Sequence, residues 1–400
     1  MRIRVRYLLV GLLFLVVATV AIKWVIPIRD RSSRTRQLKA DVHVIHGDLR
    51  VESCASDWLV TALEKCGRKR WADWLETEPT ELRLYGNLPS NEWLQRLELH
   101  KSLRKIWLGG KFTDAGVEAL RPLINLEEVG LDNTGLGEDT FEALRQLPHL
   151  KKLHVNSPLI SATAIESIRS MSNLESLTLQ NAMISPRMQV DLTPLSKLRS
   201  LDLFGARFTM VDLPPVIFPS SLERLSLHAM EVNDHTLDAL KTLVNLRTLD
   251  LGNLQTKEVG LAALRSVPNL HELNLVDTTL TDDALEVLNS LPALEILSLK
   301  CPPVTDEQLV KLKSPTLMTL SVNGVSLSNQ GLASLKHLTN LRSVVLTGTR
   351  IDDAGLEHLA ACPKLQLADL RNTRVTPKGV SGLAVSKPDL NCQIGPLKRR

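Results

Sequence analysis

The chain has 400 residues, of which 44% are hydrophobic but only 4% aromatic, and its formal net charge is +4. The low aromatic content predicts a core filled mainly by leucine, valine and alanine, which suits a repeat protein. Nine basic residues and one acidic residue fall within positions 1–39, so this segment carries +8 and the remainder −4. A mildly acidic remainder argues against a broad phosphate-binding surface, and we therefore expect no nucleic-acid partner.

The amino-terminal segment combines a basic tail, residues 1–6, with an apolar run that begins at Tyr7 and continues past Lys23 to Ile28. This run reaches the ~20 residues that a helix needs to cross a bilayer. We expect residues 7–28 to form an uncleaved transmembrane signal-anchor helix. The lipid bilayer is then one partner, and the protein is a single-pass protein of the cell membrane.

Two properties of this segment stay open. The small residues Thr19, Val20 and Ala21 resemble a cleavage site, and the alternative is a secreted repeat protein released from a cleaved signal peptide. Orientation in the membrane is also undecided. Three arginines precede the apolar run and five basic residues crowd positions 29–39, so the positive-inside rule does not choose a side for the repeat domain.

Residues 29–56 are expected to form a basic juxtamembrane linker, and residues 57–78 a helical, tryptophan-rich cap. Apolar residues in the second range follow a helical spacing that ends near Gly67. Five of the six tryptophans fall between positions 58 and 107. We expect this cap to shield the open edge of the first repeat, and a partner-binding site is the alternative because tryptophan is enriched in binding hot spots.

A leucine-rich pattern occupies residues 79–390, where apolar residues recur at offsets 0, 3 and 5 of a unit of 23–24 residues. Each unit predicts a short strand whose side chains at offsets 3 and 5 point inward, as in the run from Leu246 to Leu251. The thirteen units begin at Pro79, Leu103, Leu126, Leu150, Leu174, Leu198, Leu222, Leu246, Leu270, Leu294, Leu317, Leu341 and Leu365.

A helix is expected after each strand. Thr281 can cap the helix that follows it, and Thr305 with Gln308 forms a capping box. Leu285 and Leu288 then face the strand layer. A helix is about 10 Å wide whereas parallel strands lie about 4.8 Å apart, so the stack must bend with its strands on the concave face.

The predicted fold class is α/β: a right-handed solenoid, or horseshoe, with a concave parallel β-sheet and convex helices, preceded by one transmembrane helix. Prolines interrupt the helix pattern at residues 183–195 and 210–219, where we expect extended or single-turn structure. Residues 391–400 are expected to be a basic carboxy-terminal tail.

The strings Thr-Asp-Ala-Gly at 113–116, Asp-Asp-Ala-Gly at 352–355 and Thr-Arg-Ile at 349–351 resemble the leucine-rich-repeat family. They are similar to its bacterial, membrane-anchored subgroup with 24-residue LxxLxLxxTxITDAGLxxL repeats. The resemblance covers about residues 79–390 and implies a leucine-rich-repeat solenoid and protein–protein interaction. The usual Asn at offset 8 is mostly Thr here, so we expect a ladder of threonine hydroxyls at Thr134, Thr278, Thr349 and Thr373.

Side chains at offsets 2, 4 and 6 are expected on the concave face, where mixed charge with a few aromatics fits a protein surface better than a nucleic-acid track. We expect partner binding to centre on Phe204, Arg224 and His228, because neighbouring strands would bring a ring, a guanidinium and an imidazole within reach of one another. The further candidate partner-binding residues are Asp202, Asp250, Tyr85 and Trp107.

The sequence does not indicate enzymatic activity, because it contains no GxSxG, HExxH, CxxC or GxxxxGK[ST] motif. The five cysteines lack metal-site spacing, and whether Cys54 and Cys66 form a disulfide is open. We expect no catalytic residue, cofactor, metal or small-molecule substrate, and a membrane-anchored scaffold that binds a protein ligand. The alternative is a substrate-recognition adaptor resembling F-box leucine-rich-repeat ubiquitin-ligase subunits, although residues 40–78 lack a convincing F-box match.

Overall fold

The computed structural model describes residues 33–40, 42, 48–53, 76–84, 91–110, 112–132, 136–156, 158–184, 190–208, 216–229, 237–252, 261–276, 280–300, 304–323 and 327–396. The expected transmembrane segment 7–28 and residues 57–75 of the expected cap lie outside these residues. None of the described helices is both long and apolar enough to cross a bilayer. The chain divides into two compact units, residues 1–156 and residues 157–400.

Within residues 29–56, which we expected to be a linker, the first unit contains helical and strand residues. Residues 33–40 are helical, and β1 (Asp48–Ser53) pairs antiparallel with β2 (Glu76–Leu84). Residues 76–78, which we expected to be the end of the helical cap, form the amino-terminal end of strand β2. An edge strand presents unpaired N–H and C=O groups, and β1 supplies partners for them along the outer edge of β2.

Parallel strands continue the first unit from β2 in the order β2-β3-β4-β5. The inward residues Ile106, Val129 and Leu153 are aligned across three of these strands. The elements are β3 (Lys105–Gly109), β4 (Glu128–Asp132), β5 (Lys152–Asn156), the α-helices α5 (Asn91–Gln95), α6 (Asp114–Val117) and α7 (Glu138–Leu144), and the 3-10 helices η2 (Arg96–Leu99) and η3 (Glu118–Leu120).

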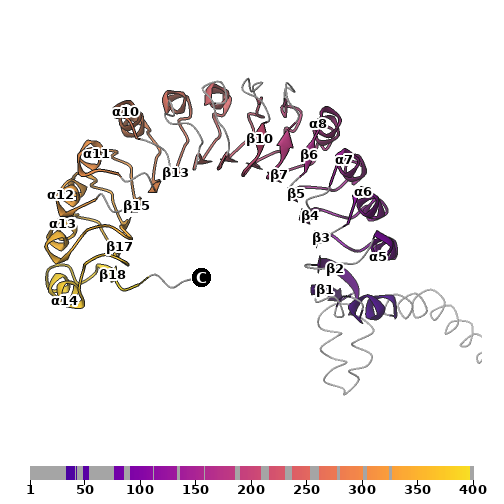
Figure 1. Ribbon diagram of the computed structural model, residues 1–400, viewed down its shortest axis with the longest axis horizontal. Coiled ribbons are helices and arrows are strands. Elements are labelled where there is room, and N and C mark those ends of the chain that lie inside the picture. The colour runs from indigo at the N-terminus through magenta and orange to yellow at the C-terminus, as the bar shows by residue number, and fades with distance from the viewer. Residues whose placement is uncertain are drawn as a thin grey trace, which may run out of the picture. The chain divides into compact units, whose positions relative to one another are not determined.

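The second unit is a run of parallel strands with helices on one side. In Figure 1 its strands follow the inner side of an arc and its helices the outer side. The strands, in sheet order, are β7 (Ser176–Gln180), β9 (Ser200–Asp202), β11 (Arg224–Ser226), β12 (Thr248–Asp250), β13 (Glu272–Val276), β14 (Ile296–Lys300), β15 (Thr319–Asn323), β16 (Ser343–Val345), β17 (Leu367–Asp369) and β18 (Asn391–Gln393). β18 lies in the segment that we expected to be a tail.

The helices of this unit are short and vary in type from repeat to repeat. They are α8 (Ala162–Arg169), α10 (Asp282–Ser290), α11 (Asp306–Lys311), α12 (Asn329–Leu332), α13 (Leu356–Ala360), α14 (Pro377–Ser386), η4 (Ala239–Thr242), η5 (Leu261–Ser266), η6 (Leu335–His337) and η7 (Asp353–Gly355). The capping box of Thr305 and Gln308 is confirmed, and Thr281 accepts a hydrogen bond from the Ala284 N–H at 3.2 Å.

Extended structure in the proline-rich repeats is confirmed where the chain is described. A second, three-stranded parallel sheet is formed by β6 (Leu159–Ile160), β8 (Met183–Ile184) and β10 (Arg207–Phe208). Farther along, Asp191 pairs with Ile217 in an isolated parallel bridge. Proline lacks the amide donor that a helix needs, so short extended segments replace the helix there.

The strand register expected from the leucine pattern is confirmed. Leu246, Leu249 and Leu251 have no exposed surface, and Leu249 is aligned with Leu225 and Leu273 on the neighbouring strands. Thr248 and Asp250 alternate with them and are only half-buried. Side chains at offsets 3 and 5 therefore build the core, and those at offsets 2, 4 and 6 line the opposite face.

The two described threonines of the expected ladder each bond to a carbonyl of their own turn. Thr349 Oγ1 donates to Leu346 O at 2.8 Å, and Thr373 Oγ1 donates to Leu370 O at 2.6 Å. Both bonds lie within one repeat, because the hydroxyl reaches a carbonyl only three residues back. Thr134 and Thr278 lie outside the described residues.

Several bonds between repeats come from the residue that precedes the first leucine of a unit. The Asn125 amide donates to Lys101 O at 2.7 Å, and the Asn269 amide donates to Val244 O at 2.8 Å, each reaching a carbonyl of the preceding repeat. Shorter hydroxyl side chains reach a nearer carbonyl, as Ser221 Oγ does with Leu198 O at 2.7 Å. These bonds satisfy backbone groups that the turn leaves unpaired.

Acidic side chains at the helix starts form a second set of bonds between repeats. Asp353 accepts hydrogen bonds from the Thr376 N–H at 2.8 Å and the Thr376 hydroxyl at 2.6 Å. Asp306 bonds in the same way to Ser328 of the next repeat. Each acid thus holds the first residue of the next helix start, which is the N-cap residue that orients the helix.

Candidate functional site

The candidate site lies on the concave face over β9, β11 and β12. The inward leucines of these strands fix the outward positions by alternation, so Asp202, Ser226 and Asp250 are aligned side by side at the ends of the strands. Phe204 and His228 follow two residues beyond the first two of these. Five of the seven expected partner-binding residues therefore belong to these three neighbouring repeats.

Phe204 and His228 form a stacked pair. Their ring centroids are 5.1 Å apart and their planes differ by 9°. The Phe204 side chain remains 39% exposed, whereas His228 is half-buried. Offset-stacked rings at this separation attract one another, and they present a broad, partly apolar surface to solvent.

A glycine makes room for this pair. A methyl group on Gly252 would lie 2.4 Å from His228 Nδ1, so the imidazole occupies the space that a side chain would fill. Asp250 contacts both the glycine and the imidazole. Its carboxylate accepts a hydrogen bond from the Gly252 N–H at 2.8 Å and lies 3.3 Å from His228 Nδ1. Asp202 accepts the Phe204 N–H at 2.9 Å in the equivalent turn.

Arg224 is not placed beside the ring pair. It is aligned with Ser200 and Thr248 at the starts of the strands, and it precedes His228 by four residues. At about 3.3 Å per residue, that separation is about 13 Å along the strand. The structure therefore brings Phe204 and His228 together and leaves Arg224 at the other end of the same surface.

The first unit carries a similar arrangement around Trp107. A methyl group on Gly130 would lie 2.3 Å from the Trp107 ring, so the indole fills the space beside this glycine. On the next strand, the His154 ring lies with its centroid 5.2 Å from that of Trp107, and the two ring planes differ by 34°. The Trp107 indole N–H donates to Glu128 at 3.0 Å. Tyr85 lies outside the described residues.

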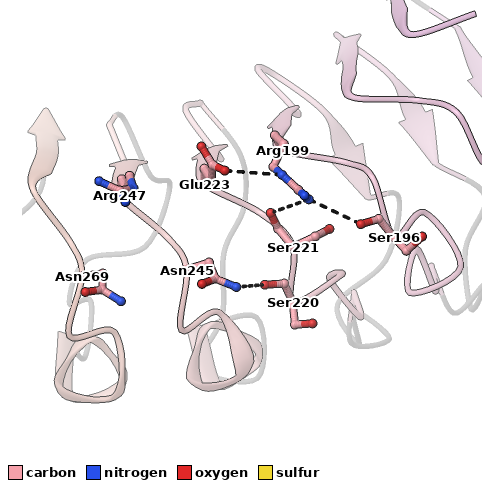
Figure 2. Close-up of a pocket in the computed structure, with 8 residues that line it drawn as sticks. All are labelled: Ser196, Arg199, Ser220, Ser221, Glu223, Asn245, Arg247 and Asn269. Carbon is pink, nitrogen blue, oxygen red and sulfur yellow. Dashed lines mark hydrogen bonds and ion pairs between the residues drawn. The ribbon is translucent and has the colours of Figure 1, made fainter.

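A shallow polar pocket of about 370 Å³ lies at the starts of the same strands as Phe204 and His228. Figure 2 shows its lining, in which Arg199, Glu223 and Arg247 come from successive repeats. The other lining residues are Ser196, Ser220, Ser221, Asn245 and Asn269. We call this the rim pocket. It was missed because its residues lie at offsets from −2 to 1, outside the alternation that we used to choose concave side chains.

Two of the three charged groups of the rim pocket are paired with each other. Arg199 Nε lies 3.4 Å from Glu223 Oε1, and the Arg199 guanidinium also donates to Ser196 O at 3.4 Å and Ser221 O at 3.3 Å. Arg247 is exposed, and within the described part of the chain its guanidinium has no hydrogen bond or ion pair. The alternation of basic and acidic residues at offset 1 is the sequence signal for this pocket.

Charge on this surface changes sign along the strands. Arg199, Arg224 and Arg247 lie at the starts of the strands with one acid, Glu223, and two aspartates lie at the strand ends. Elsewhere a strand-end aspartate is neutralised: on β17 the hydrogen-bonded Arg371 guanidinium holds the pKa of Asp369 below its usual range. No group of three or more His, Cys, Asp or Glu residues in the described ranges could hold a metal ion.

No protein-family model and no curated protein sequence matches the chain. Among solved structures, an internalin from Listeria monocytogenes is 17% identical over 86% of this chain and 95% of its own, with a TM-score of 0.43. A leucine-rich-repeat protein from Leptospira interrogans is 18% identical over 78% and 89%, with a TM-score of 0.45. TLR13, in its complex with the RNA ssRNA13, is 19% identical over 79% of this chain and 50% of its own, with a TM-score of 0.51.

The last of these comparisons, together with the register and burial described above, establishes the class of the fold. This chain has the leucine-rich-repeat solenoid fold, with parallel strands on one side of each repeat and short helices or extended segments on the other. At this level of identity the comparison describes architecture only, and the function must be argued from the surface of this chain.

Proposed function

We propose that this protein is an interaction scaffold that binds a protein ligand on the concave face over β9, β11 and β12. The observation that carries the proposal is the stacked Phe204–His228 pair, in which Phe204 is exposed and His228 half-buried among polar neighbours. Aromatic anchors surrounded by polar groups are characteristic of protein interfaces. The proposal assigns no reaction to the chain.

Burial of the ring pair would stabilise a complex at little entropic cost. His228 stacks on Phe204, lies 3.3 Å from Asp250 and packs over Gly252, so binding immobilises it little further. Asp202 and Asp250 beside the rings supply hydrogen-bond acceptors at the edge of the contact. A preorganised aromatic surface with polar neighbours is the form that binding hot spots usually take.

Site-directed photo-crosslinking in cells tests this proposal. We expect a benzophenone amino acid at Phe204 to crosslink one dominant protein, identified by mass spectrometry. Val310 of α11 is the matched control, because it is an exposed apolar residue on the helix side, with 50% of its surface accessible. Equal crosslinking at both positions, or an adduct that nuclease removes as expected for an RNA partner, would contradict the proposal.

We also propose that residues 7–28 hold the scaffold at the cell membrane. The support is the length and apolar character of this run, which fits a bilayer. The full chain should stay with membranes through a carbonate wash. A soluble product that begins near Ile22 would instead demonstrate a cleaved signal peptide and a secreted protein.

A further inference from the structure

We propose that the rim pocket binds one carboxylate of an acidic side chain in the protein ligand, with Arg247 as the residue that holds it. This inference rests on the proposed function, because it names a second contact on the same three strands. The pocket extends to offset 1, and the ring pair lies at offset 6 of the same repeats. That interval is about 16 Å, which an extended ligand segment of about five residues can cover.

The charge balance of the pocket favours a single negative charge. The Arg199–Glu223 pair neutralises itself, and the Arg199 guanidinium is occupied further by two backbone carbonyls. Arg247 is left with a net charge of +1 at the pocket. A dianion such as phosphate would also face the Glu223 carboxylate, and that repulsion disfavours it relative to a carboxylate.

The chemistry of the lining agrees with a carboxylate. A guanidinium presents parallel N–H donors that match the two oxygens of a carboxylate. Ser220 is an exposed hydroxyl residue at the same pocket, and the Asn245 amide is already oriented by its bond to Ser220 O at 3.0 Å. An apolar anchor would leave these polar groups without solvent or partner, so the pocket is unsuited to one.

Arginine side-chain NMR of the full chain in detergent micelles tests the inference with defined probes. The probes are a blocked pentapeptide with one central glutamate, the same peptide with glutamine, and inorganic phosphate. We expect a saturable shift of the Arg247 Nε–H resonance with the glutamate peptide. The glutamine peptide should bind about tenfold more weakly, because a charge-assisted bond is lost.

Two variants isolate the charge from the fold. R247Q should abolish binding of the glutamate peptide, followed here by the peptide's own resonances, and the exposed Arg247 guanidinium has no hydrogen bond or ion pair to lose among the described residues. R342Q is the matched control, because Arg342 is exposed at the same repeat position and its carbonyl accepts the same pair of backbone bonds. E223Q should bind the glutamate peptide at least as tightly as the unchanged chain, because a repulsive carboxylate is removed.

Three results would overturn the inference: equal binding of the glutamate and glutamine peptides, equal responses of Arg247 and Arg342, or phosphate binding as tight as that of the glutamate peptide. If Arg247 is silent while a benzophenone at Phe204 still captures a protein, the carboxylate pocket fails and the proposed function stands. If the glutamate peptide binds but Phe204 captures no protein, the pocket is supported and the proposed function fails.

Discussion

At Gly355 the backbone passes so close to the preceding repeat that a side chain has no room. A methyl group there would lie 2.5 Å from Asn329 Oδ1 and 3.0 Å from Ile351 Cγ2. Asn329 cannot easily move away, because its amide donates to Asp352 at 2.6 Å and its oxygen accepts the Asp352 N–H at 3.2 Å. The glycine of the Asp-Ala-Gly string therefore serves packing between repeats.

Alanine at Gly355 should destabilise the protein by about 1–3 kcal/mol, the usual cost of overpacking a tight contact. The control is Gly382→Ala in α14, where nothing lies within 4 Å of the added methyl group. That change should be neutral or stabilising, because alanine favours helix over glycine. Chemical denaturation of both variants gives the comparison. Equal losses of stability would show that close approach does not explain Gly355.

At the level of whole elements, the helix starts link one repeat to the next through acidic side chains. The hydrogen bonds from the Thr376 hydroxyl and N–H hold the pKa of Asp353 below its usual value of 3.8. A lowered folded-state pKa means that this bond stabilises the fold above the unfolded-state pKa. The contribution is lost as pH falls through the folded-state pKa.

The variant D353N should therefore be less stable than the unchanged chain at neutral pH. The difference between their free energies of unfolding should shrink as pH falls below about 3.8, the usual pKa of the group. Urea denaturation at a series of pH values measures this difference. A difference that stays constant through the acid range would mean that ionisation of Asp353 contributes nothing to the bond.

Elements with a strong periodic signal were predictable, and those without one were not. The leucine spacing determined which residues of each strand face the core, as Leu249 illustrates. Strand β1 was not predicted, because it lies outside the repeat pattern and pairs antiparallel with β2. The threonines at offset 8 were predictable as polar turn residues, but spacing alone does not identify the carbonyl that each hydroxyl reaches.

At the scale of the whole molecule, one strand surface of the second unit carries both proposed sites, at opposite ends of the same strands. The ring pair was predictable, because offset 6 places Phe204 and His228 on adjacent strands. Arg224 lies on a strand next to that of Phe204 but four residues before His228, and from the sequence we compared only which strands are neighbours, not where along each strand a residue lies. The rim pocket could not be predicted from the strand alternation, because residues from the turns of successive repeats assemble it.

The affinity of the crosslinked partner for the variant F204A/H228A tests the central claim most directly. Neither side chain belongs to the inward leucine rows, so the variant should fold, which circular dichroism can verify. We predict binding weaker by at least ~1–2 kcal/mol, because the anchor of the interface is removed. The variant V310A on α11 should bind as the unchanged chain does. Unchanged affinity in a folded F204A/H228A variant would contradict the claim that the concave face over β9, β11 and β12 is the binding surface.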